Sequence, residues 1–534
     1  MNTRKVLYQF GYRRCADQDR PSPARHPVVV VGAGPVGLCT AIDLAQRGVP
    51  VVLLDDADRI GEGSRGICYA KRTLEILDRL GVADPCLEKG VTWKIGKVFQ
   101  NNDLLYAFDL LPEDGHKMPA FINLQQYYLE HALVERAATL PNLEIRWRNK
   151  VIDLQRSNDG ATLTVETPED CYNLDSDWVV AADGARSALR GMLGLAFQGE
   201  AFEDRFLIAD VKMKVDFPPE RWFWFDPPFH EGRSALLHKQ PDDVWRIDLQ
   251  LGSDADAKAE QAPERVTPRL RQMLGHDDFS LEWVSVYTFQ CRRLERFVHG
   301  RVVFAGDAAH QVSPFGARGA NSGIQDAENL SWKLALVLKG EAPESLIESY
   351  DLERSAAADE NIGHSTRSTD FIAPRSAQEL RFRDATLSLA RYAPFAKRMV
   401  NSGRLSMPSI YETPLSTPYV DHWSGSACVG APLPDAPMRD RNGKSIWLLE
   451  ALGGEETILH VPNGAPPPSD HRVLVLGDDL IDERGLFAQR FGASPGSTYL
   501  VRPDQHLAAR WRHATPSMIE SASRRMRGFE GGPA

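Results

Sequence analysis

Apolar residues near the start of the chain follow the order strand, helix, strand. Residues 28–31 are a continuous run of valine, which is typical of a parallel strand buried on both faces. Apolar residues then recur at helical spacing, at Leu38, Ile42, Leu44 and Ala45. A second apolar run covers residues 51–54 and ends at Asp55. This order predicts an α/β domain that begins with a βαβ unit.

Two later apolar runs also end at an acidic residue beside a glycine. The stretch "DWVVAADGARSALR" at residues 177–190 predicts a strand that ends at Asp183. Considered alone, this stretch is also explained by a plain Asp-Gly turn. The stretch "RVVFAGDAAH" at residues 301–310 predicts a strand that ends at Gly306-Asp307, and a helix follows it. The apolar stripe of that helix consists of Ile324, Ala327, Leu330 and Leu334.

The rest of the chain shows different patterns. Between residues 205 and 297 apolar and polar positions alternate, which predicts an antiparallel sheet with one face over a ligand site. Residues 340–415 have the pattern of helices with polar faces. The Pro/Gly/Ser-rich stretch "LSTPYVDHWSGSACVGAPLPDAP" then predicts a linker, and alternating strand and helix patterns follow it.

Composition limits the kind of protein. The 534 residues are 43% hydrophobic and 25% charged, as in soluble globular proteins, and their number suggests about three domains. The net charge of -11 repels phosphate backbones, so nucleic acid is not an expected partner. Apolar runs are too short for membrane insertion and residues 1–26 lack a signal-peptide core, so we expect a cytoplasmic protein. The seven cysteines form no C-x-x-C, which predicts neither a disulfide framework nor a metal site.

The first predicted strand leads into a glycine motif. Gly32, Gly34 and Gly37 fill G-x-G-x-x-G between a predicted strand and a predicted helix, and Asp55 ends the next strand. A helix N-terminus has unpaired amides and a partial positive charge, so we expect this loop to bind a pyrophosphate. Asp55 would accept hydrogen bonds from an adenosine ribose. The motif does not distinguish NAD from FAD.

Three motifs in order give the chain a family resemblance. G-x-G-x-x-G at residues 32–37, D-G-x-x-S-x-x-R at 183–190 and G-D-A-A-H at 306–310 resemble the fingerprints of class A, single-component flavoprotein aromatic hydroxylases. The resemblance covers about residues 26–410 and is to the 4-hydroxybenzoate hydroxylase and phenol hydroxylase superfamily, with 3-(3-hydroxyphenyl)propionate hydroxylase-like proteins looking closest. It implies an α/β fold with an FAD-binding Rossmann-like domain, an inserted mixed or antiparallel β-sheet substrate domain and a C-terminal thioredoxin-like domain.

The expected domain boundaries follow from this division. They are 1–25 for a polar N-terminal extension, 26–200 and 296–415 for the two parts of the FAD-binding domain, 201–295 for the substrate domain and 425–534 for the C-terminal domain. No cysteine follows Cys428, so we expect the last domain to lack thiol redox chemistry and to be structural or to form a homodimer. Its Arg502-Pro503-Asp504 segment resembles a hairpin typical of this domain in the family.

The resemblance also implies which residues contact FAD. Asp183 belongs to a motif tied to both FAD and the reduced nicotinamide nucleotide, and Asp307 would accept hydrogen bonds from ribityl hydroxyls. Arg65 matches a basic residue near the FAD phosphates, with a solvated loop charge as the alternative. Gln126 matches a residue that reaches the ribityl chain, with Gln125 as the alternative if the register differs by one. The expected cofactor contacts are Gly32, Ala33, Gly34, Pro35, Val36, Gly37, Asp55, Arg65, Gln126, Asp183, Gly306, Asp307, Gly316, Gly319, Ala320 and Asn321.

The loop after residue 310 is expected to approach the flavin ring. Gly316 and Gly319 lack a Cβ, so the backbone there can approach a flat ligand closely. Ala320 and Asn321 are expected to start the following helix, whose first free amides can point at the pyrimidine edge of the flavin.

Two residues of this loop, Pro314 and Arg318, are predicted to be catalytic. Arg318 would place a cation beside the negative charge of reduced flavin. Relatives have Gln or Lys in this segment, so the resemblance carries over the electrostatic role of Arg318 but not its geometry. The alternative is that Arg318 points to solvent or pairs with an acid such as Asp326. His310 is expected to belong to the FAD motif rather than to act as a general base.

The implied reaction is the hydroxylation of an aromatic ring. NADH or NADPH would reduce FAD, reduced flavin would trap dioxygen as a hydroperoxide, and the distal oxygen would pass to a phenolic ring. The expected substrate is a small phenolic or aromatic acid, which needs a cation and hydroxyl partners. The candidate substrate contacts are Trp224, His238, Arg246 and Tyr287, each with a structural role as the alternative.

Three other functions stay open. A tailoring hydroxylase of a larger polyketide or antibiotic would keep the fold. A flavin halogenase or a non-oxygenating dehydrogenase would change the chemistry, although the halogenase signature W-x-W-x-I-P is absent because residues 222–227 are "WFWFDP". A flavin-containing binding or sensor protein would catalyse no reaction.

Overall fold

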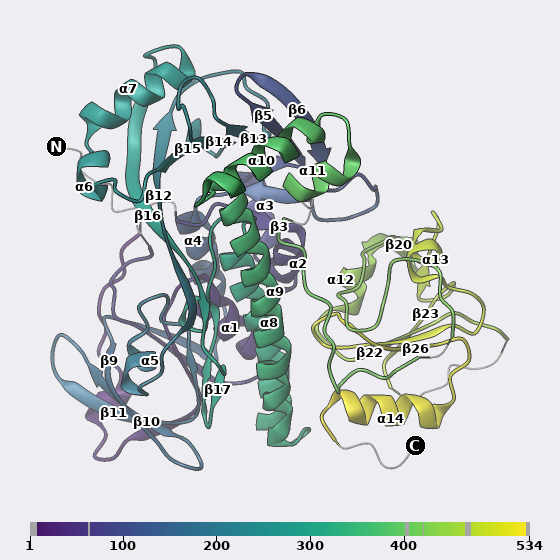
Figure 1. Ribbon diagram of the computed structural model, residues 1–534. Helices are drawn as coiled ribbons and strands as arrows, with labels where there is room; N and C mark the ends of the chain where they lie inside the picture. Colours follow the sequence, from purple (N-terminus) through teal and green to yellow (C-terminus); the bar gives the residue numbers. More distant parts are fainter. Residues whose placement is uncertain (1–7, 62–64, 401–404, 420, 465–470, 530–534) are drawn as a thin grey trace.

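Three groups of elements make up the molecule (Figure 1). The computed structural model describes residues 8–61, 65–400, 405–419, 421–464 and 471–529. One sheet contains the N-terminal strands, a second sheet lies above it in the view of Figure 1, and the C-terminal residues form a body on the right. Two long helices, α8 (Gly319–Leu338) and α9 (Glu348–Ile372), run through the middle. This mixed architecture confirms the expected α/β fold class.

The first sheet contains the predicted parallel strands. Its order is β17-β18-β11-β1-β2-β8, and β9 and β10 extend it from β11. The strands are β1 (Ala24–Val31), β2 (Val51–Asp55), β8 (Leu143–Trp147), β9 (Lys150–Arg156), β10 (Ala161–Glu166), β11 (Cys171–Ala181), β17 (Val298–His299) and β18 (Val302–Phe304). Val28, Val29 and Val30 are fully buried in β1, and each contributes about 1.5–3 kcal/mol to stability. Because β1, β2, β11 and β18 are parallel, the glycine motif and the predicted acids lie at one edge of the sheet.

Helices and a small sheet surround this parallel core. They are η1 (Ala16–Asp19), α1 (Pro35–Gln46), α2 (Lys71–Leu80), α3 (Ala83–Lys89), α4 (Gln126–Ala137) and α5 (Ala188–Met192), with β3 (Cys68–Ala70), β4 (Val91–Trp93) and β7 (Phe121–Asn123). The N-terminal ends of α1 and α8 touch: a Cβ on Gly323 of α8 would lie 2.7 Å from Cγ2 of Val36. Two helix N-termini therefore sit side by side at the edge where the acids lie.

The second sheet combines the predicted alternating strands with strands from elsewhere. Its order is β19-β16-β12-β15-β14-β13-β5-β6. The strands are β5 (Ile95–Gln100), β6 (Asp103–Asp109), β12 (Gln198–Lys212), β13 (Arg221–Phe225), β14 (Ser234–Lys239), β15 (Val244–Leu251), β16 (Ser280–Arg293) and β19 (His310–Gln311). Strand β5 pairs in parallel with β13, so the sheet includes residues outside 201–295, the range expected for the substrate domain.

The two faces of this sheet pack against different partners. The outer face packs on α7 (Pro263–Leu274), beside the short α6 (Ala257–Glu260); the side chains of this cluster include Leu207, Trp224, Trp245, Ile247, Leu249, Val266 and Leu270. The inner face packs on Phe315 of the predicted ring-site loop; its apolar side chains include Phe206, Phe223, Phe225, Leu236 and Phe289. Residues that alternate along each strand therefore separate a structural face from a face toward the predicted ligand site.

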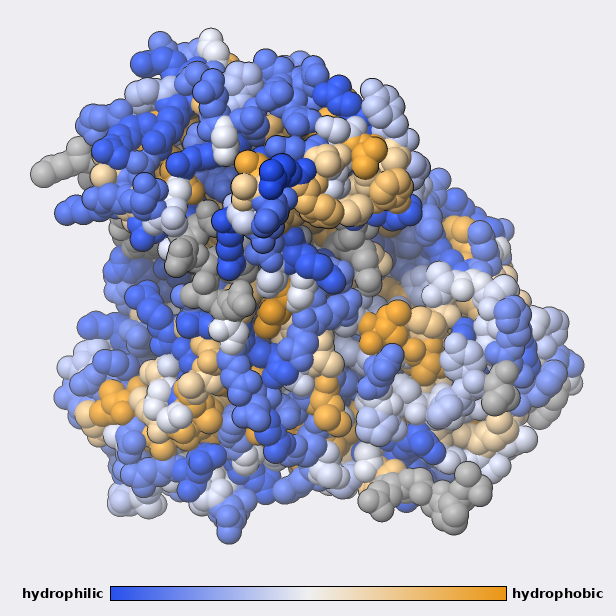
Figure 2. Space-filling view, viewed as in Figure 1, coloured by the Kyte–Doolittle hydropathy of each residue, from blue (hydrophilic) through white to orange (hydrophobic). Residues whose placement is uncertain are grey.

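Three helices and a short turn follow α8. They are η3 (Glu344–Ile347), α9, α10 (Ala377–Ala390) and α11 (Pro394–Val400). Leu387 and Ala390 of α10 pack on the inner-face cluster, so this helix covers that side of the sheet. Figure 2 shows apolar side chains over α10 and α11 as well, and Phe395 and Met399 are about half exposed there (54% and 47%). None of the described helices is long and apolar enough to cross a membrane.

The C-terminal residues form two small sheets and three helices. The first sheet is β21-β20-β24 and the second is β23-β22-β25-β26, in which β22 and β23 are parallel. The elements are β20 (Pro437–Asp440), β21 (Ser445–Trp447), α12 (Leu448–Leu452), β22 (Thr457–His460), β23 (Val473–Val475), β24 (Leu480–Ile481), α13 (Leu486–Phe491), β25 (Thr498–Val501), β26 (Leu507–Trp511) and α14 (Pro516–Met526).

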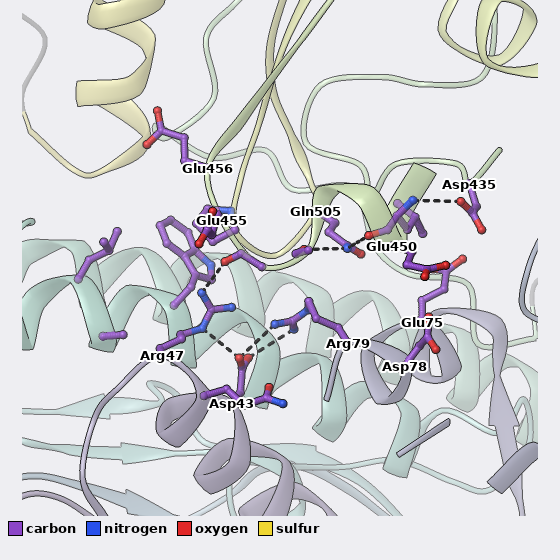
Figure 3. Close-up of a pocket in the computed structure, with 18 of the residues that line it drawn as sticks. Asp43, Arg47, Glu75, Asp78, Arg79, Asp435, Glu450, Glu455, Glu456 and Gln505 are labelled. Atoms are coloured by element: carbon purple, nitrogen blue, oxygen red, sulfur yellow. Dashed lines mark hydrogen bonds and ion pairs between the residues drawn. The ribbon is translucent and has the colours of Figure 1, made fainter. Parts of the chain in front are cut away.

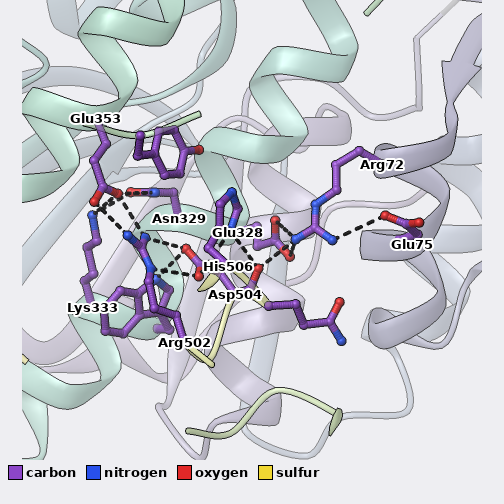
Figure 4. A network of polar contacts seen from close by, with 12 residues as sticks. Arg72, Glu75, Glu328, Asn329, Lys333, Glu353, Arg502, Asp504 and His506 are labelled. Carbon is purple, nitrogen blue, oxygen red and sulfur yellow. Dashed lines mark hydrogen bonds and ion pairs between the residues drawn. The ribbon is translucent and has the colours of Figure 1, made fainter. Parts of the chain in front are cut away.

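A buried ionic network holds this C-terminal body against the two long helices (Figure 4). The guanidinium of Arg502 donates to both carboxylate oxygens of Glu353 on α9, at 2.8 and 2.9 Å, and pairs with Asp504 at 2.6 Å. Lys333 of α8 also contacts Glu353, at 2.8 Å, and these cations hold the pKa of Glu353 well below its usual range. Arg72 of α2 reaches across as well and donates to the carbonyl of Asp504 at 2.7 Å. Removal of one partner from a buried ion pair is strongly destabilising, so the hairpin at residues 502–504 holds the C-terminal body firmly against α8 and α9; we call this contact the joint.

Candidate active site

The glycine loop has the geometry of a ligand cradle. Gly32 has φ +106°, and a Cβ there would lie 2.4 Å from the carbonyl oxygen of Ala182. A Cβ on Gly37 would lie 1.9 Å from the carbonyl oxygen of Gly32, so both glycines are required by packing. Nothing lies within 4 Å of a Cβ built on Gly34, where α1 begins. The loop is therefore tight on the protein side and open in front of the helix N-terminus, as a bound pyrophosphate requires.

Asp55 organises this loop from the end of β2. Its carboxylate accepts hydrogen bonds from the amide of Ala33 at 2.6 Å and from the amide of Ala57 at 2.8 Å. Burial raises the pKa of Asp55 above its ordinary value. The side chain that was expected to bind a ribose thus also sets the shape of the glycine loop.

Asp183 leaves one buried carboxylate oxygen without a partner. Its Oδ2 accepts a hydrogen bond from the amide of Leu189 at 3.1 Å, whereas Oδ1 is buried and has no partner among the described residues. Arg190, from the same motif, donates to the carbonyl of Ala308 at 3.2 Å and so joins this motif to G-D-A-A-H. A buried oxygen without a partner is costly unless a ligand supplies a donor.

Asp307 presents an exposed side chain just beyond the end of β18. It lies in the turn η2 (Gly306–Ala308), whose other residues, Gly306 and Ala308, are buried. Desolvation by the surrounding protein raises the pKa of the carboxylate, while nearby basic groups favour its ionised form. The carboxylate is therefore accessible to a ligand.

His310 is buried and paired within the protein. Its Nε2 lies 2.6 Å from Oδ2 of Asp326, whose Oδ1 pairs with Arg354 of α9 at 2.6 Å. The amide of Gly306 donates to the same Asp326 Oδ2 at 2.9 Å. These contacts give His310 a role in holding the turn, in line with its expected place in the FAD motif.

The ring-site loop ends in helix α8. Pro314 accepts a hydrogen bond from the amide of Ala317 at 3.0 Å, and Gly316 has φ +98°. The helix begins at Gly319, one residue earlier than expected. As in any α-helix, the amides of its first turn have no acceptor within the helix. They form an electropositive edge at the end of the loop.

Asn321 is a clamp rather than a free polar contact. Its amide nitrogen donates to the carbonyls of Cys68 at 2.9 Å and Ala317 at 2.6 Å. Its oxygen accepts from the amide of Ala70 at 2.8 Å and from the Thr73 hydroxyl at 2.6 Å. Both polar atoms of the Asn321 side chain are already engaged in two hydrogen bonds each, so only the backbone of Asn321 can contact a flavin.

Arg318 is buried rather than pointing to solvent. It is 5% exposed, and its Nη1 donates to Oδ1 of Asn361 on α9 at 2.8 Å. Asp326, the acid named as its alternative partner, pairs with His310 and Arg354. The guanidinium is thus buried directly before the N-terminus of α8.

Gln126 and Gln125 contact different parts of the protein. Its Oε1 accepts a hydrogen bond from the amide of Gly66 at 3.0 Å, and its Nε2 donates to Glu130, which in turn accepts from the amide of Gly61 at 2.7 Å. Gln125 is buried and points toward the carbonyl of Pro241 at 3.3 Å. Glu130, which the sequence analysis did not single out, shares the loop-holding role.

The expected substrate residues separate on the two faces of the second sheet. Trp224 lies in the outer-face cluster with Phe229 and α7, which corrects the expectation that it contacts substrate. His238, Arg246 and Tyr287 lie on the inner face, opposite the outer-face residues of their strands. Arg246 is buried against Asp210 at 2.9 Å, so its charge is already neutralised and it does not supply the expected free cation.

Two inner-face residues were missed by the sequence analysis. Arg221 lies one residue before the Trp222–Leu237 pair, and His238 lies one residue after it, so the two side chains are neighbours across β13 and β14. Asp248 of β15 follows Arg246 on the same face, and burial raises its pKa to about 6. A charged residue at an inward position of an aromatic strand, as in "RWFWF", is the signal that would have found Arg221.

A cavity of about 730 Å³ lies elsewhere, between α1, α2, α8 and the C-terminal body (Figure 3). Its floor carries Asp43, which pairs with Arg47 at 3.0 Å and with Arg79 at 3.1 Å. These residues lie at the C-terminal ends of α1 and α2, away from the glycine loop. The cavity is therefore separate from the nucleotide cradle.

The residues fit FAD on the chain's own geometry. Gly34 leaves open space at a helix N-terminus, Asp183 has a buried oxygen without a partner among the described residues, and Asp307 presents an exposed carboxylate. The first turn of α8 adds amides at the far end of the same edge. Together they offer sites for phosphates, for hydroxyls and for the edge of a polar ring system.

Comparison with known proteins agrees with this geometry. Residues 25–365 match the FAD binding domain family. The chain is 29% identical over 393 residues, covering 73% of this chain and 69% of the relative, to a 3-(3-hydroxy-phenyl)propionate/3-hydroxycinnamic acid hydroxylase of Mycolicibacterium smegmatis. It is 30% identical over 511 residues, covering 90% of each chain, to 6-methylpretetramide 4-monooxygenase of Streptomyces rimosus.

A solved structure has the same fold. The flavin-dependent monooxygenase PieE, determined with FAD and substrate, superposes with a TM-score of 0.81 over 95% of this chain and 100% of its own, at 23% identity. The chain belongs to the FAD binding domain family and is a flavin-dependent aromatic monooxygenase with FAD as its cofactor.

Proposed function

We propose that this protein uses NADH or NADPH and dioxygen to hydroxylate a small phenolic or aromatic acid. The observation that carries the proposal is the polar inner face of the second sheet, which lies opposite the ring-site loop and contains Arg221, His238 and Asp248. Apolar packing of Phe315 on Phe206, with ring centroids 5.0 Å apart, closes one side of this space. A small aromatic ring with polar substituents suits such surroundings.

FAD supplies the redox chemistry: it takes up hydride from the nicotinamide and activates dioxygen for transfer of one oxygen atom to the ring. The chain's own groups bind and orient. The glycine loop, Asp183 and Asp307 would hold the cofactor, and the first amides of α8 with the buried Arg318 would stabilise negative charge at the ring edge. Helices α10 and α11 cover the inner face and exclude water from the reacting centre.

A second candidate, the tailoring of a larger polyketide, has its own support. The 6-methylpretetramide 4-monooxygenase matches 90% of this chain, and a 3-(3-hydroxy-phenyl)propionate/3-hydroxycinnamic acid hydroxylase of Mycobacterium sp. (strain JLS) matches 89% of it. The coverage favours a shared architecture, and the two functions differ in the size of ligand that the inner face accepts.

The experiment is a substrate screen with the purified FAD-loaded protein. Phenolic acids, simple phenols and tetracyclic polyketides are supplied with NADH or NADPH, and nicotinamide oxidation, peroxide and products are measured together. The proposal expects a phenolic acid to accelerate nicotinamide oxidation and to appear as a product heavier by one oxygen atom. If only polyketides are hydroxylated, the second candidate replaces the first, and if every compound gives only peroxide, both are wrong.

A further inference from the structure

Buried polar atoms without partners collect on the inner face of the second sheet. Four side-chain atoms on this face are buried and have no hydrogen-bond partner among the described residues. They are His238 Nδ1, Asp248 Oδ1, Ser285 Oγ and the hydroxyl oxygen of Tyr106. Ile208 pairs with Asp248 on one side and with Ser285 on the other, so these two side chains belong to one row across β15, β12 and β16. Native proteins leave few such atoms unsatisfied, and a cluster of them points to a ligand.

Arg221 adds a charge to this cluster. Within the part of the chain that the structure describes it has no ion pair and no hydrogen bond, and its guanidinium lies 5.7 Å from the ring centroid of Phe223. The contrast is with Arg246, two strands away, which Asp210 neutralises at 2.9 Å. Arg221 is partly buried, and desolvation lowers the pKa of its guanidinium. A partly desolvated guanidinium without an ion pair is costly, and an anionic ligand would reduce that cost.

The cluster lies opposite the flavin-facing loops. Cys68, whose carbonyl is held by the clamp residue Asn321, donates its thiol to Asn123 at 3.1 Å, and Asn123 donates to the carbonyl of Lys239, next to His238 on β14, at 2.8 Å. His238 packs edge-on against Trp93, with ring centroids 5.9 Å apart, and Trp93 shares an apolar cluster with Ala317 of the ring-site loop. A ligand held by Arg221 and Asp248 would therefore lie between the sheet and the predicted ring site.

We propose that Arg221 selects an aromatic substrate with an ionised oxygen group, and that Asp248 accepts a hydrogen bond from a hydroxyl on the same molecule. The inference rests on the proposed function and adds the residues that decide which substrates bind. Arg221 offers N–H donors that suit a carboxylate or a phenolate oxygen, and Asp248 Oδ1 offers an acceptor that suits a ring hydroxyl. Arg246 and Asp210 neutralise each other's charge, so we assign the selection to Arg221 and Asp248.

The test compares an acid with its neutral counterpart. Probes are 3-(3-hydroxyphenyl)propionate and its primary amide, and binding to the FAD-loaded protein is followed by the change in flavin absorbance. We expect the wild type to bind the acid about 10-fold or more tightly than the amide, since a charged hydrogen bond is lost with the amide. Arg221→Gln should bring the two dissociation constants to within about 3-fold, and Arg221→Lys should keep part of the preference.

A matched control lies on the neighbouring strand. Lys97 of β5 is a cation on the outer face, where it pairs with Glu220 at 2.6 Å, so Lys97→Gln should leave the preference for the acid unchanged. Resorcinol serves as the third probe, because it has hydroxyls but no carboxylate. If Arg221→Gln weakens only the acid, the group that Arg221 selects is the carboxylate; if it weakens resorcinol as much as the acid, Arg221 does not discriminate by charge and the inference is wrong.

Several results would overturn the inference. They are equal binding of acid and amide by the wild type, an unchanged preference in Arg221→Gln, or no binding of any probe. Should Arg221→Gln fail to fold, as judged by its FAD content, the wild-type comparison and Arg221→Lys still decide. Tight selective binding of the acid without any hydroxylated product would contradict the proposed function but leave the anion site intact, so the two failures are distinguishable.

Discussion

At the scale of single residues, three aspartates take three different roles at one edge of the first sheet. Asp55 accepts hydrogen bonds from two loop amides, Asp183 keeps one oxygen without a partner among the described residues, and Asp307 is exposed. The sequence motifs locate all three, because each follows a buried strand directly. Their roles differ because each depends on which backbone amides happen to lie within reach.

Removal of the charge at Asp183 or Asp307 should weaken cofactor binding. We expect Asp183→Asn and Asp307→Asn each to raise the dissociation constant of FAD by about 10- to 100-fold, since each loses a charged hydrogen-bond acceptor. Fluorescence titration of the apoprotein with FAD measures this. Asp177→Asn is the matched control, because Asp177 lies on β11, the strand that leads to Asp183, and forms a surface ion pair with Arg25 at 2.6 Å. Unchanged affinity in both test variants would remove these carboxylates from the cofactor site.

Asp248 should give the reaction a pH dependence. Burial raises its pKa to about 6, so it is ionised above that value and protonated below it. The ionised carboxylate is the stronger acceptor of a hydrogen bond from a ring hydroxyl, so kcat/KM for a phenolic substrate should fall as the pH drops below about 6. Asp248→Asn should lower kcat/KM near neutral pH and flatten this limb of the profile. A wild-type limb that persists in Asp248→Asn would assign the titration to another group.

At the scale of elements, the N-terminus of α8 is held by one side chain. Asn321 connects α8 with β3 and with the ring-site loop through hydrogen bonds at 2.6 to 2.9 Å. The glycines at residues 316 and 319 free the backbone to approach a ligand, and this clamp restores the order that they remove. The position of the helix amides thus depends on a residue that does not itself offer a free polar group.

Asn321→Ala should therefore loosen this element. The variant leaves several buried backbone groups without a partner, and we expect a loss of about 3 kcal/mol in the free energy of unfolding together with weaker FAD binding. Urea unfolding of the apoprotein and FAD titration measure the two effects. Asn173→Ala, at an exposed position of β11, is the control and should change neither. Normal FAD affinity in Asn321→Ala would show that α8 does not need the clamp.

The elements also show what the sequence could predict. Motifs that sit on consecutive strands and turns, such as the one at residues 32–37, were predictable because the nearby chain determines their geometry. Arg221 and Asp248 were not, because their inward direction depends on the pairing of β13 with β5 and of β15 with β12 across long stretches of sequence. Trp224 was assigned to the wrong face for the same reason: strand alternation separates two faces but does not say which one a helix will cover.

At the scale of the whole molecule, the C-terminal body is locked onto α8 and α9 by the network of Figure 4. Arg502 pairs with both Glu353 and Asp504, and Trp332 of α8 donates to Asp504 at 3.0 Å. Because α8 also begins at the ring-site loop, the joint and the candidate active site share one helix. The expected role of this body, structural or dimer-forming, stays a prediction.

Arg502→Met should uncouple this joint. It removes the guanidinium that two buried carboxylates share and leaves Glu353 with Lys333 alone, so we expect a loss of about 3–5 kcal/mol in the free energy of unfolding and faster proteolysis between residues 405 and 436. Arg439→Met is the control, because Arg439 forms a half-exposed pair with Glu483 at 2.6 Å, which is worth about 1 kcal/mol or less. Equal stability of the two variants would show that the network does not hold the bodies together.

The central claim is that the chain transfers one atom of dioxygen to a phenolic substrate. The most direct measurement supplies the FAD-loaded protein with NADH or NADPH, 3-(3-hydroxyphenyl)propionate and ¹⁸O₂, and analyses the product by mass spectrometry. We predict a hydroxylated product with one ¹⁸O atom and nicotinamide oxidation that accelerates when the aromatic acid is present. A product without ¹⁸O, or nicotinamide oxidation that yields only hydrogen peroxide with every aromatic compound offered, would contradict the account.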